Sequence, residues 1–115
     1  MNAALKTKWI EALRSGEFAQ GVGELCSISN GLVEHCCLGV LGEVAGIPRE
    51  QLLSKDHLST VGRDDLLGPW VDGNFNADRE YTHTSLQRKL AAMNDSDCEF
   101  TEIADWIETN VPAEA

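Results

Sequence analysis

A run of apolar residues that contains two glycines restricts this fold more than any other feature of the sequence. Cys37 and Leu41 recur at helical spacing, which predicts a buried helix over residues 37–45. Gly39 and Gly42 lie on one side of that helix, and each costs about 1 kcal/mol relative to alanine. Glycines on one side indicate that another backbone approaches closely there. A buried strand is the alternative for the first half of this run.

Helical patterns recur in three other parts of the chain. Apolar residues at every fourth position predict a helix over residues 2–15. Residues 84–87 (TSLQ) resemble a capping box, which predicts that a second helix begins there. A third helix has its apolar face over residues 100–107 and ends before Pro112. Weaker patterns predict two shorter helical segments, 48–53 and 64–67.

Two β-hairpins are predicted from turn residues that separate short extended runs. Asn30 and Gly31 form the strongest hairpin signal in the chain, between strands expected at 24–28 and 32–35. A second hairpin is expected to join its strands through a polar loop. Its predicted strands are 70–72 and 79–82, and its loop is 73–78.

These elements predict an α+β fold in a single small domain. A chain of 115 residues corresponds to one domain by size, and its 43% hydrophobic content is sufficient for an ordinary core. We expect three main helices packed with one or two short antiparallel β-hairpins. The domain is predicted to span residues 1–111, and residues 112–115 form a flexible tail.

The charge balance restricts the class of partner. Nineteen acidic residues oppose nine basic ones, which gives a formal net charge of −10. Binding of nucleic acid or of an anionic membrane requires clustered Lys and Arg, and the basic residues here are scattered. The charge favours a basic protein partner, including a nucleic-acid-binding protein whose groove this chain would occupy. The alternative is a solvated acidic surface that only aids solubility.

The apolar segments are short. None approaches the roughly 20 residues that a membrane-spanning helix needs. The first residues lack the apolar core of a signal peptide. We therefore expect no membrane association and a cytoplasmic location, where the four cysteines would be free thiols.

Cysteine catalysis is one alternative function. Cys37 is predicted at a helix N-terminus, a position that lowers the pKa of a thiol. His83 follows a predicted strand and would serve as the base, in the order of small papain-like amidases of the NlpC type. The opposing interpretation is that Cys36 and Cys37 are small buried apolar residues.

Metal binding has weaker support, so no metal and no cofactor are predicted. Residues 72–83 begin like an EF-hand loop, but Ala77 replaces the required glycine and His83 the required glutamate. Structural zinc sites typically use a Cys-x2-Cys spacing, and this sequence contains none. The candidate zinc ligands are Cys26, His35, Cys36, Cys37 and Cys98.

The candidate binding residues lie near the last two predicted helices and on the first helix. Trp106 and Ile10 lie off the centre of their apolar faces, so they either cover the edge of the core or form a dimer or partner contact. The acidic candidates have a simpler alternative interpretation as residues that suit helix ends. The full predicted set is Ile10, Asn94, Asp95, Asp97, Glu99 and Trp106.

Four segments in a fixed order resemble one group of proteins. They are 9–16 (WIEALRSG), 20–25 (QGVGEL), 36–41 (CCLGVL), and 94–95 (ND) followed by 100–108 (FTEIADWIE). Together they resemble small uncharacterised proteins of bacteriophage and prophage genomes, over most of the chain except residues 47–80. Those proteins carry Cys-Asp at the positions of Gly42 and Glu43, and a basic residue at the position of Val22. A metal or thiol role that needs a third cysteine is therefore not implied.

The resemblance implies a phage accessory protein that acts in the cytoplasm of a bacterial host, and it implies no established activity. With the acidity, it favours a non-enzymatic protein that binds and modulates a host protein or defence system through an acidic surface. One alternative is a protein that sequesters a small ligand such as a nucleotide signal. The other alternative is the NlpC-like cysteine hydrolase.

Overall fold

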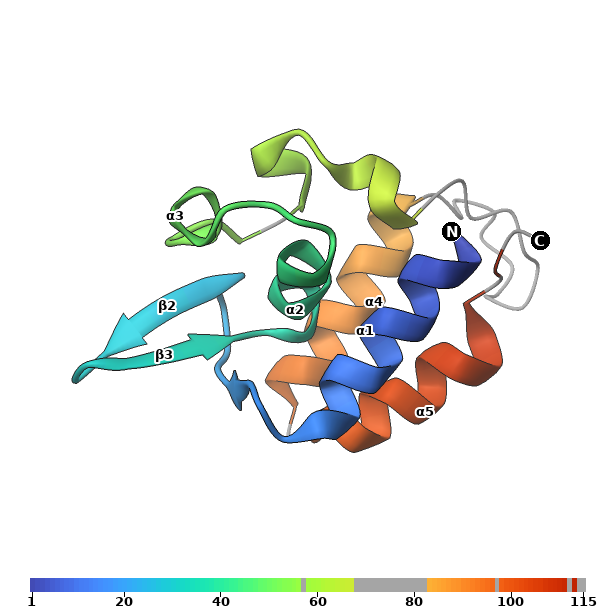
Figure 1. The fold of residues 1–115 in the computed structure, drawn as a ribbon, viewed down its shortest axis with the longest axis horizontal. Coiled ribbons are helices and arrows are strands. Elements are labelled where there is room, and N and C mark those ends of the chain that lie inside the picture. Colours follow the sequence, from blue (N-terminus) through green and yellow to red (C-terminus); the bar gives the residue numbers. More distant parts are fainter. Residues whose placement is uncertain (57, 68–82, 97, 112, 114–115) are drawn as a thin grey trace.

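The computed structural model describes residues 1–56, 58–67, 83–96, 98–111 and 113. It confirms the predicted α+β class (Figure 1). The helices are α1 (Ala3–Ser15), α2 (Cys37–Val44), α3 (Arg49–Leu52), α4 (His83–Asp95) and α5 (Phe100–Asn110). Two 3-10 turns are η1 (Leu58–Val61) and η2 (Asp64–Leu67). The strands are β1 (Ala19–Gln20), β2 (Cys26–Ser29) and β3 (Leu32–His35).

The first predicted hairpin is confirmed, and a short third strand joins it. β2 and β3 pair antiparallel around a turn at Asn30 and Gly31, whose φ angles are 52° and 80°. β1 pairs with β3 in parallel, so the strand order is β1-β3-β2. The predicted second hairpin and most of the predicted tail, residues 112, 114 and 115, lie outside the described residues.

The central helix α2 packs tightly against the chain just before β2. A Cβ atom at Gly39 would lie 1.7 Å from the carbonyl oxygen of Leu25. The same oxygen accepts a hydrogen bond from the backbone N–H of Cys36 at 3.3 Å. The predicted close approach of another backbone is confirmed at Gly39. At Gly42 the nearest atoms belong instead to the side chain of Leu52, at 2.9 Å.

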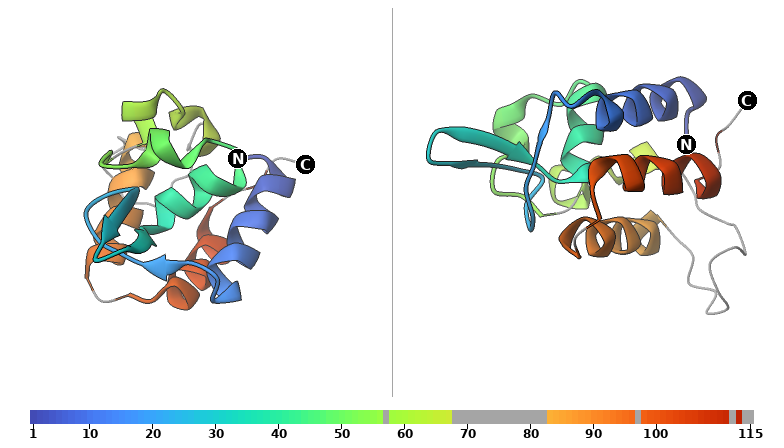
Figure 2. Two further views of the ribbon diagram at one scale, coloured as in Figure 1. Left: turned by 60° about the vertical axis from the view of Figure 1, so that its left-hand side comes forward. Right: turned by 90° about the horizontal axis from the view of Figure 1, so that it is seen from below.

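Helix α1 lies against both α2 and α5 (Figure 2). The indole N–H of Trp9 donates a hydrogen bond to the carbonyl of Cys37 at 2.9 Å, so this buried ring has a polar partner inside the core. Asn2 caps the start of α1 by accepting from the N–H of Leu5, and Gly16 ends the helix with a φ of 79°. The first helix therefore begins and ends as its sequence indicates.

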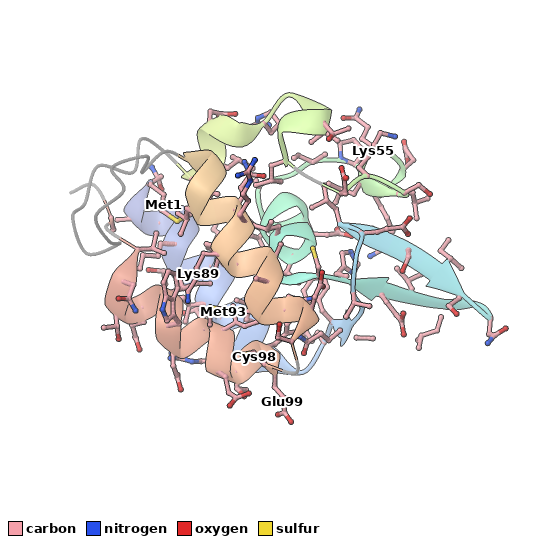
Figure 3. The ribbon with its side chains drawn as sticks, turned by 180° about the vertical axis from the view of Figure 1, so that it is seen from behind. Met1, Lys55, Lys89, Met93, Cys98 and Glu99 are labelled. Atoms are coloured by element: carbon pink, nitrogen blue, oxygen red, sulfur yellow. The ribbon has the colours of Figure 1, made fainter. Side chains whose placement is uncertain are left out.

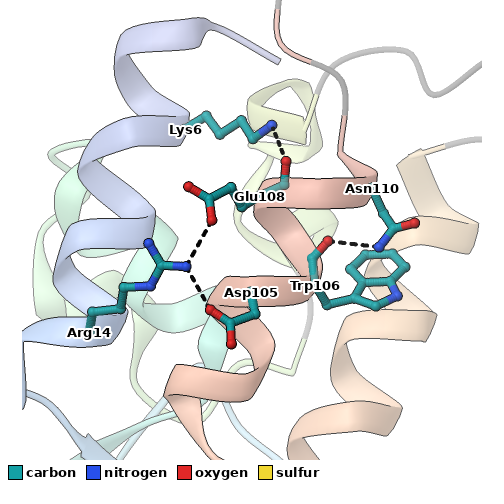
Figure 4. A network of polar contacts seen from close by, with 6 residues as sticks. All are labelled: Lys6, Arg14, Asp105, Trp106, Glu108 and Asn110. Carbon is teal, nitrogen blue, oxygen red and sulfur yellow. Dashed lines mark hydrogen bonds and ion pairs between the residues drawn. The ribbon is translucent and has the colours of Figure 1, made fainter.

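Polar contacts close the outer side of the α1–α5 pair (Figure 4). The Arg14 guanidinium donates to the carboxylates of Asp105 at 2.6 Å and Glu108 at 3.0 Å. The Lys6 ammonium donates to the carbonyl of Val111 at 2.6 Å, where α5 ends. Because the Arg14 pairs are exposed to solvent, packing of the apolar faces contributes more to this interface than they do.

Candidate functional site

Three of the predicted binding residues lie together where α4 ends. Asn94 is 2% exposed, and both the oxygen and the nitrogen of its side-chain amide make two hydrogen bonds each. Its Oδ1 accepts from the side chain of Gln20 at 3.0 Å and from the N–H of Cys37 at 3.1 Å. Its Nδ2 donates to the carbonyl of Gly21 at 2.7 Å and to Asp95 Oδ1 at 3.3 Å. Asn94 therefore joins α4 to β1 and to the start of α2, as a structural clamp.

Around this clamp lies a surface hollow of about 260 Å³. Figure 3 shows two of its lining residues, Cys98 and Glu99, between α4 and α5. Gln20 connects the hollow to α5 by donating to the carbonyl of Cys98 at 2.8 Å and accepting from the N–H of Phe100 at 3.1 Å. The lining residues are Gln20, Val22, Asn94, Asp95, Cys98 and Glu99. Asp97, also predicted for this site, lies outside the described residues.

The chemistry of the hollow is unfavourable for a nucleotide. Its charged lining groups are the carboxylates of Asp95 and Glu99, and its amides already hydrogen-bond within the protein. Carboxylates repel phosphate groups at short range. The hollow thus gives no support to sequestration of a nucleotide signal.

The two adjacent cysteines at the start of α2 are buried. Burial raises the pKa of the Cys36 thiol to about 11 and raises that of the Cys37 thiol well above its ordinary value. The Cys37 thiol points to the carbonyl of Leu90 at 3.5 Å, while Asn94 already accepts from the first N–H of the helix. The expected lowering of the thiol pKa by the helix N-terminus is therefore outweighed by desolvation.

One member of the predicted catalytic pair of Cys37 and His83 lies partly outside the described residues. His83 begins α4, but its side chain lies outside the described part of the chain. The raised pKa values of the Cys36 and Cys37 thiols disfavour the thiolate form that a cysteine hydrolase uses as its nucleophile. Among the described residues, no three His, Cys, Asp or Glu side chains are placed to hold a metal ion. The EF-hand-like segment lies mostly outside them.

The two hydrophobic candidates differ in exposure. Ile10 is 8% exposed and belongs to the core, so it offers little surface to a partner. Trp106 is half-buried, and the Lys89 ammonium lies 5.8 Å from the centre of its ring. Its backbone carbonyl accepts from Asn110 at 2.9 Å (Figure 4). Both side chains fit the interpretation that they cover the core.

Two exposed apolar side chains lie away from the hollow, on the β2–β3 hairpin. Ile28 is 57% exposed and Leu32 is 53% exposed, and the hairpin projects from the helical body (Figures 1 and 2). Val22, at 64%, is the other large apolar side chain in the described residues that is more than half exposed. The sequence pattern predicted this hairpin but not the exposure of its aliphatic side chains. The available signal was an isoleucine between two serines, beside a turn that places it far from the core.

The base of the hairpin is anchored through a buried histidine. His35 Nε2 lies 2.8 Å from Glu43 Oε2, which also accepts from Arg49 Nε at 2.7 Å. The Phe18 ring meets the His35 ring edge-on at 5.1 Å. Burial raises the pKa of the Glu43 carboxyl, but the hydrogen bonds from Arg49 and His35 outweigh it and hold that pKa below its ordinary value. These contacts fix the hairpin to α2 and α3.

The segment that carries the hairpin is uniformly acidic. Residues 17–35 contain Glu17, Glu24 and Glu34 and no Lys or Arg. The hairpin itself, residues 26–35, combines exposed aliphatic side chains with one carboxylate, Glu34, and no Lys or Arg.

The family model of a domain of unknown function (DUF8296) matches residues 1–52. This segment includes α1, all three strands, α2 and α3, and thus the hairpin with its anchor at Glu43 and Arg49. The Asn94 clamp and Trp106 lie beyond it. No curated protein and no solved structure matches the chain.

The helices in the described ranges have at most 13 residues each. None of them is both long enough and apolar enough to cross a bilayer.

Proposed function

We propose that this chain is a non-enzymatic accessory protein of phage origin that binds and modulates a host protein or a component of host defence. The observation that carries the proposal is the projecting hairpin, with Ile28 and Leu32 exposed on it. Ile28 and Leu32 lie on opposite faces of the hairpin, because Ile28 pairs with Val33 and Leu32 pairs with Ser29. Exposed apolar side chains on a projecting element are available for contact with a protein partner. The site of action that goes with the proposal is the host cytoplasm.

The hairpin side chains have no structural task that would explain their exposure. β2 and β3 already pair through their backbones, and the core is formed by other residues. Burying an aliphatic side chain completely contributes roughly 1.5–3 kcal/mol. Covering both side chains in a complex would therefore make a substantial contribution to affinity.

The charge defines the partner class further. A formal net charge of −10, with no basic residue in 17–35, favours a partner with a basic surface. Nucleic-acid-binding host proteins are the most basic class of candidates, and this chain would occupy a positively charged groove in one of them. Electrostatic steering of this kind makes association faster at low salt.

The direct test is affinity capture from a bacterial lysate with the tagged wild-type protein and with an Ile28→Ser/Leu32→Ser variant. We expect the wild type to retain one basic protein in stoichiometric amount and to release it at high salt. The double variant should retain much less of it. Val22→Ser is the matched control, because it also removes an exposed apolar side chain but lies outside the hairpin. Absence of any stoichiometric partner of the wild type would refute the proposal.

A further inference from the structure

We infer that the outer edge of β2 binds its partner by strand addition, and that the added strand alternates aliphatic with basic residues. This inference rests on the proposed binding function and specifies how the hairpin would perform it. It concerns the backbone of the hairpin as well as its side chains.

The first observation is that β2 is an edge strand whose outer side is mostly uncovered. In the order β1-β3-β2, Cys26 is the one residue of β2 that pairs on that side within the described ranges, through a parallel bridge to Leu53. The N–H of Ser54 donates to the carbonyl of Cys26 at 3.1 Å. Among the described residues nothing pairs with the outer side of residues 27–29.

The second observation is the direction of the unpaired groups. Backbone groups in an antiparallel ladder alternate between the paired strand and the outer edge. Since the carbonyl of Cys26 points outward to Ser54, the N–H and carbonyl of Ile28 also point outward. No described group hydrogen-bonds to them. Ile28 therefore offers one donor and one acceptor to an incoming strand, next to an exposed side chain.

The side chains around this edge indicate the composition of the added strand. Ile28 lies opposite Val33 on one face of the hairpin, so residues of a partner strand on that face would be aliphatic. The opposite face carries the carboxylate of Glu34, which pairs with Ser27 and would favour Lys or Arg at the alternate positions. The adjoining segment 49–56 carries no net charge, since Arg49 and Lys55 balance Glu50 and Asp56.

A second copy of this chain is a poorer occupant of the edge. Each copy carries a formal charge of −10, and the 17–35 segments that would meet contain acidic and no basic residues. Like charges brought together at an interface oppose association. A basic strand would instead be attracted by the negative charge of this chain.

A peptide titration followed by NMR of the 15N-labelled full chain tests the inference. The probe is a peptide of alternating lysine and valine, and the controls are its glutamate–valine counterpart and the lysine–valine peptide N-methylated on alternate residues. We expect the lysine–valine peptide to protect the Ile28 amide from exchange with solvent and to shift the signals of residues 26–29. The acidic peptide should not bind, and methylation of the strand edge that faces β2 should abolish binding.

Ile28→Pro removes the outward N–H and keeps the ladder to β3, whereas Ile28→Val retains the N–H and serves as its control. We expect Ile28→Pro to weaken binding of the peptide, and of the captured host protein, at least about fivefold relative to Ile28→Val. Thermal unfolding of both variants checks that each is folded.

Three results would overturn the inference. One is equal capture of a host partner by the Pro and Val variants, which rejects strand addition but leaves the proposed function intact. Another is peptide binding that shifts the NMR signals of residues outside β2 and β3 and leaves the signals of both strands unchanged. The third is concentration-dependent dimerisation through β2. Failure of the proposed function differs from these results, because the wild type would then capture no partner.

Discussion

Substitution of Gly39 by alanine tests the packing on which the central helix depends. The added Cβ would lie 1.7 Å from the carbonyl oxygen of Leu25 and 2.6 Å from its carbonyl carbon. An ordinary carbon–oxygen contact is about 3.3–3.6 Å, so two backbones must separate by well over an ångström. Neither α2 nor the segment before β2 has a flexible side chain at this contact that could move away.

The expected cost follows from three contributions. Forced overpacking costs about 3 kcal/mol at the upper end of its usual range. Separation also weakens the hydrogen bond from Cys36 N–H to the Leu25 carbonyl, which contributes about 1 kcal/mol. The higher helix propensity of alanine stabilises the folded state by about 1 kcal/mol relative to glycine. The Gly39→Ala variant should therefore lose about 3 kcal/mol of its free energy of unfolding, a large part of the about 5–15 kcal/mol typical of a domain.

Urea unfolding followed by circular dichroism measures this loss. With a denaturant slope of about 1.5 kcal/mol per molar, the midpoint should fall by about 2 M. Gly42→Ala in the same helix is the control, because its Cβ would meet the flexible end of the Leu52 side chain. That variant should stay within about 1 kcal/mol of the wild type. Equal midpoints for the two variants would refute the assignment of the backbone contact to Gly39.

Three further predictions concern the clamp, the hairpin anchor and the thiols. Asn94→Ala leaves the buried Gly21 carbonyl and the buried Cys37 N–H unpaired and should cost about 2–4 kcal/mol in urea unfolding. Asn110→Ala should cost under about 1 kcal/mol, and similar losses for the two variants would contradict the clamp. Because the pKa of Glu43 is lowered on folding, its ionised form stabilises the protein above the ordinary carboxyl pKa, and this stabilisation disappears as the pH falls through the folded pKa. Arg49→Met should reduce the loss of thermal stability between pH 6 and pH 3, measured by thermal unfolding. An unchanged dependence of stability on pH would reject the anchor. In a thiol-reagent assay at pH 8 on the native protein, the half-buried Cys98 should react before both thiols at the start of α2, and fast reaction of either of those would contradict their raised pKa values.

The sequence was sufficient to predict most local structure. Helical periodicity located the four longer helices within a few residues, and Asn30-Gly31 located the hairpin turn. The paired glycines of α2 indicated that a backbone lies close by, but periodicity specifies a face and not its occupant. That Leu25 meets Gly39 depends on the tertiary path of residues 21–25.

The remaining features depend on contacts between distant parts of the chain. β1 has only two residues, Ala19 and Gln20, which is too short for any alternating pattern. Asn94 resembles an ordinary helix-end residue in the sequence, because its partners Gln20, Gly21 and Cys37 are 57 to 74 residues away. Local patterns therefore predicted it as a surface contact, whereas tertiary packing makes it a buried clamp.

The exposed edge of the hairpin could not be predicted for a similar reason. Whether Ile28 is covered depends on where residues 53–54 run, and they stop pairing at Cys26. A sequence pattern specifies that a strand exists but not that its outer side is uncovered.

We propose the β2–β3 hairpin as the surface that binds a partner. Hydrogen–deuterium exchange of the full chain, alone and with its captured host partner, tests that claim most directly. We predict new protection of backbone amides confined to residues 26–33, with little change in α1 and α5. Protection centred on the hollow around Asn94 or on the outer face of α5, with the hairpin amides unchanged, would contradict the claim.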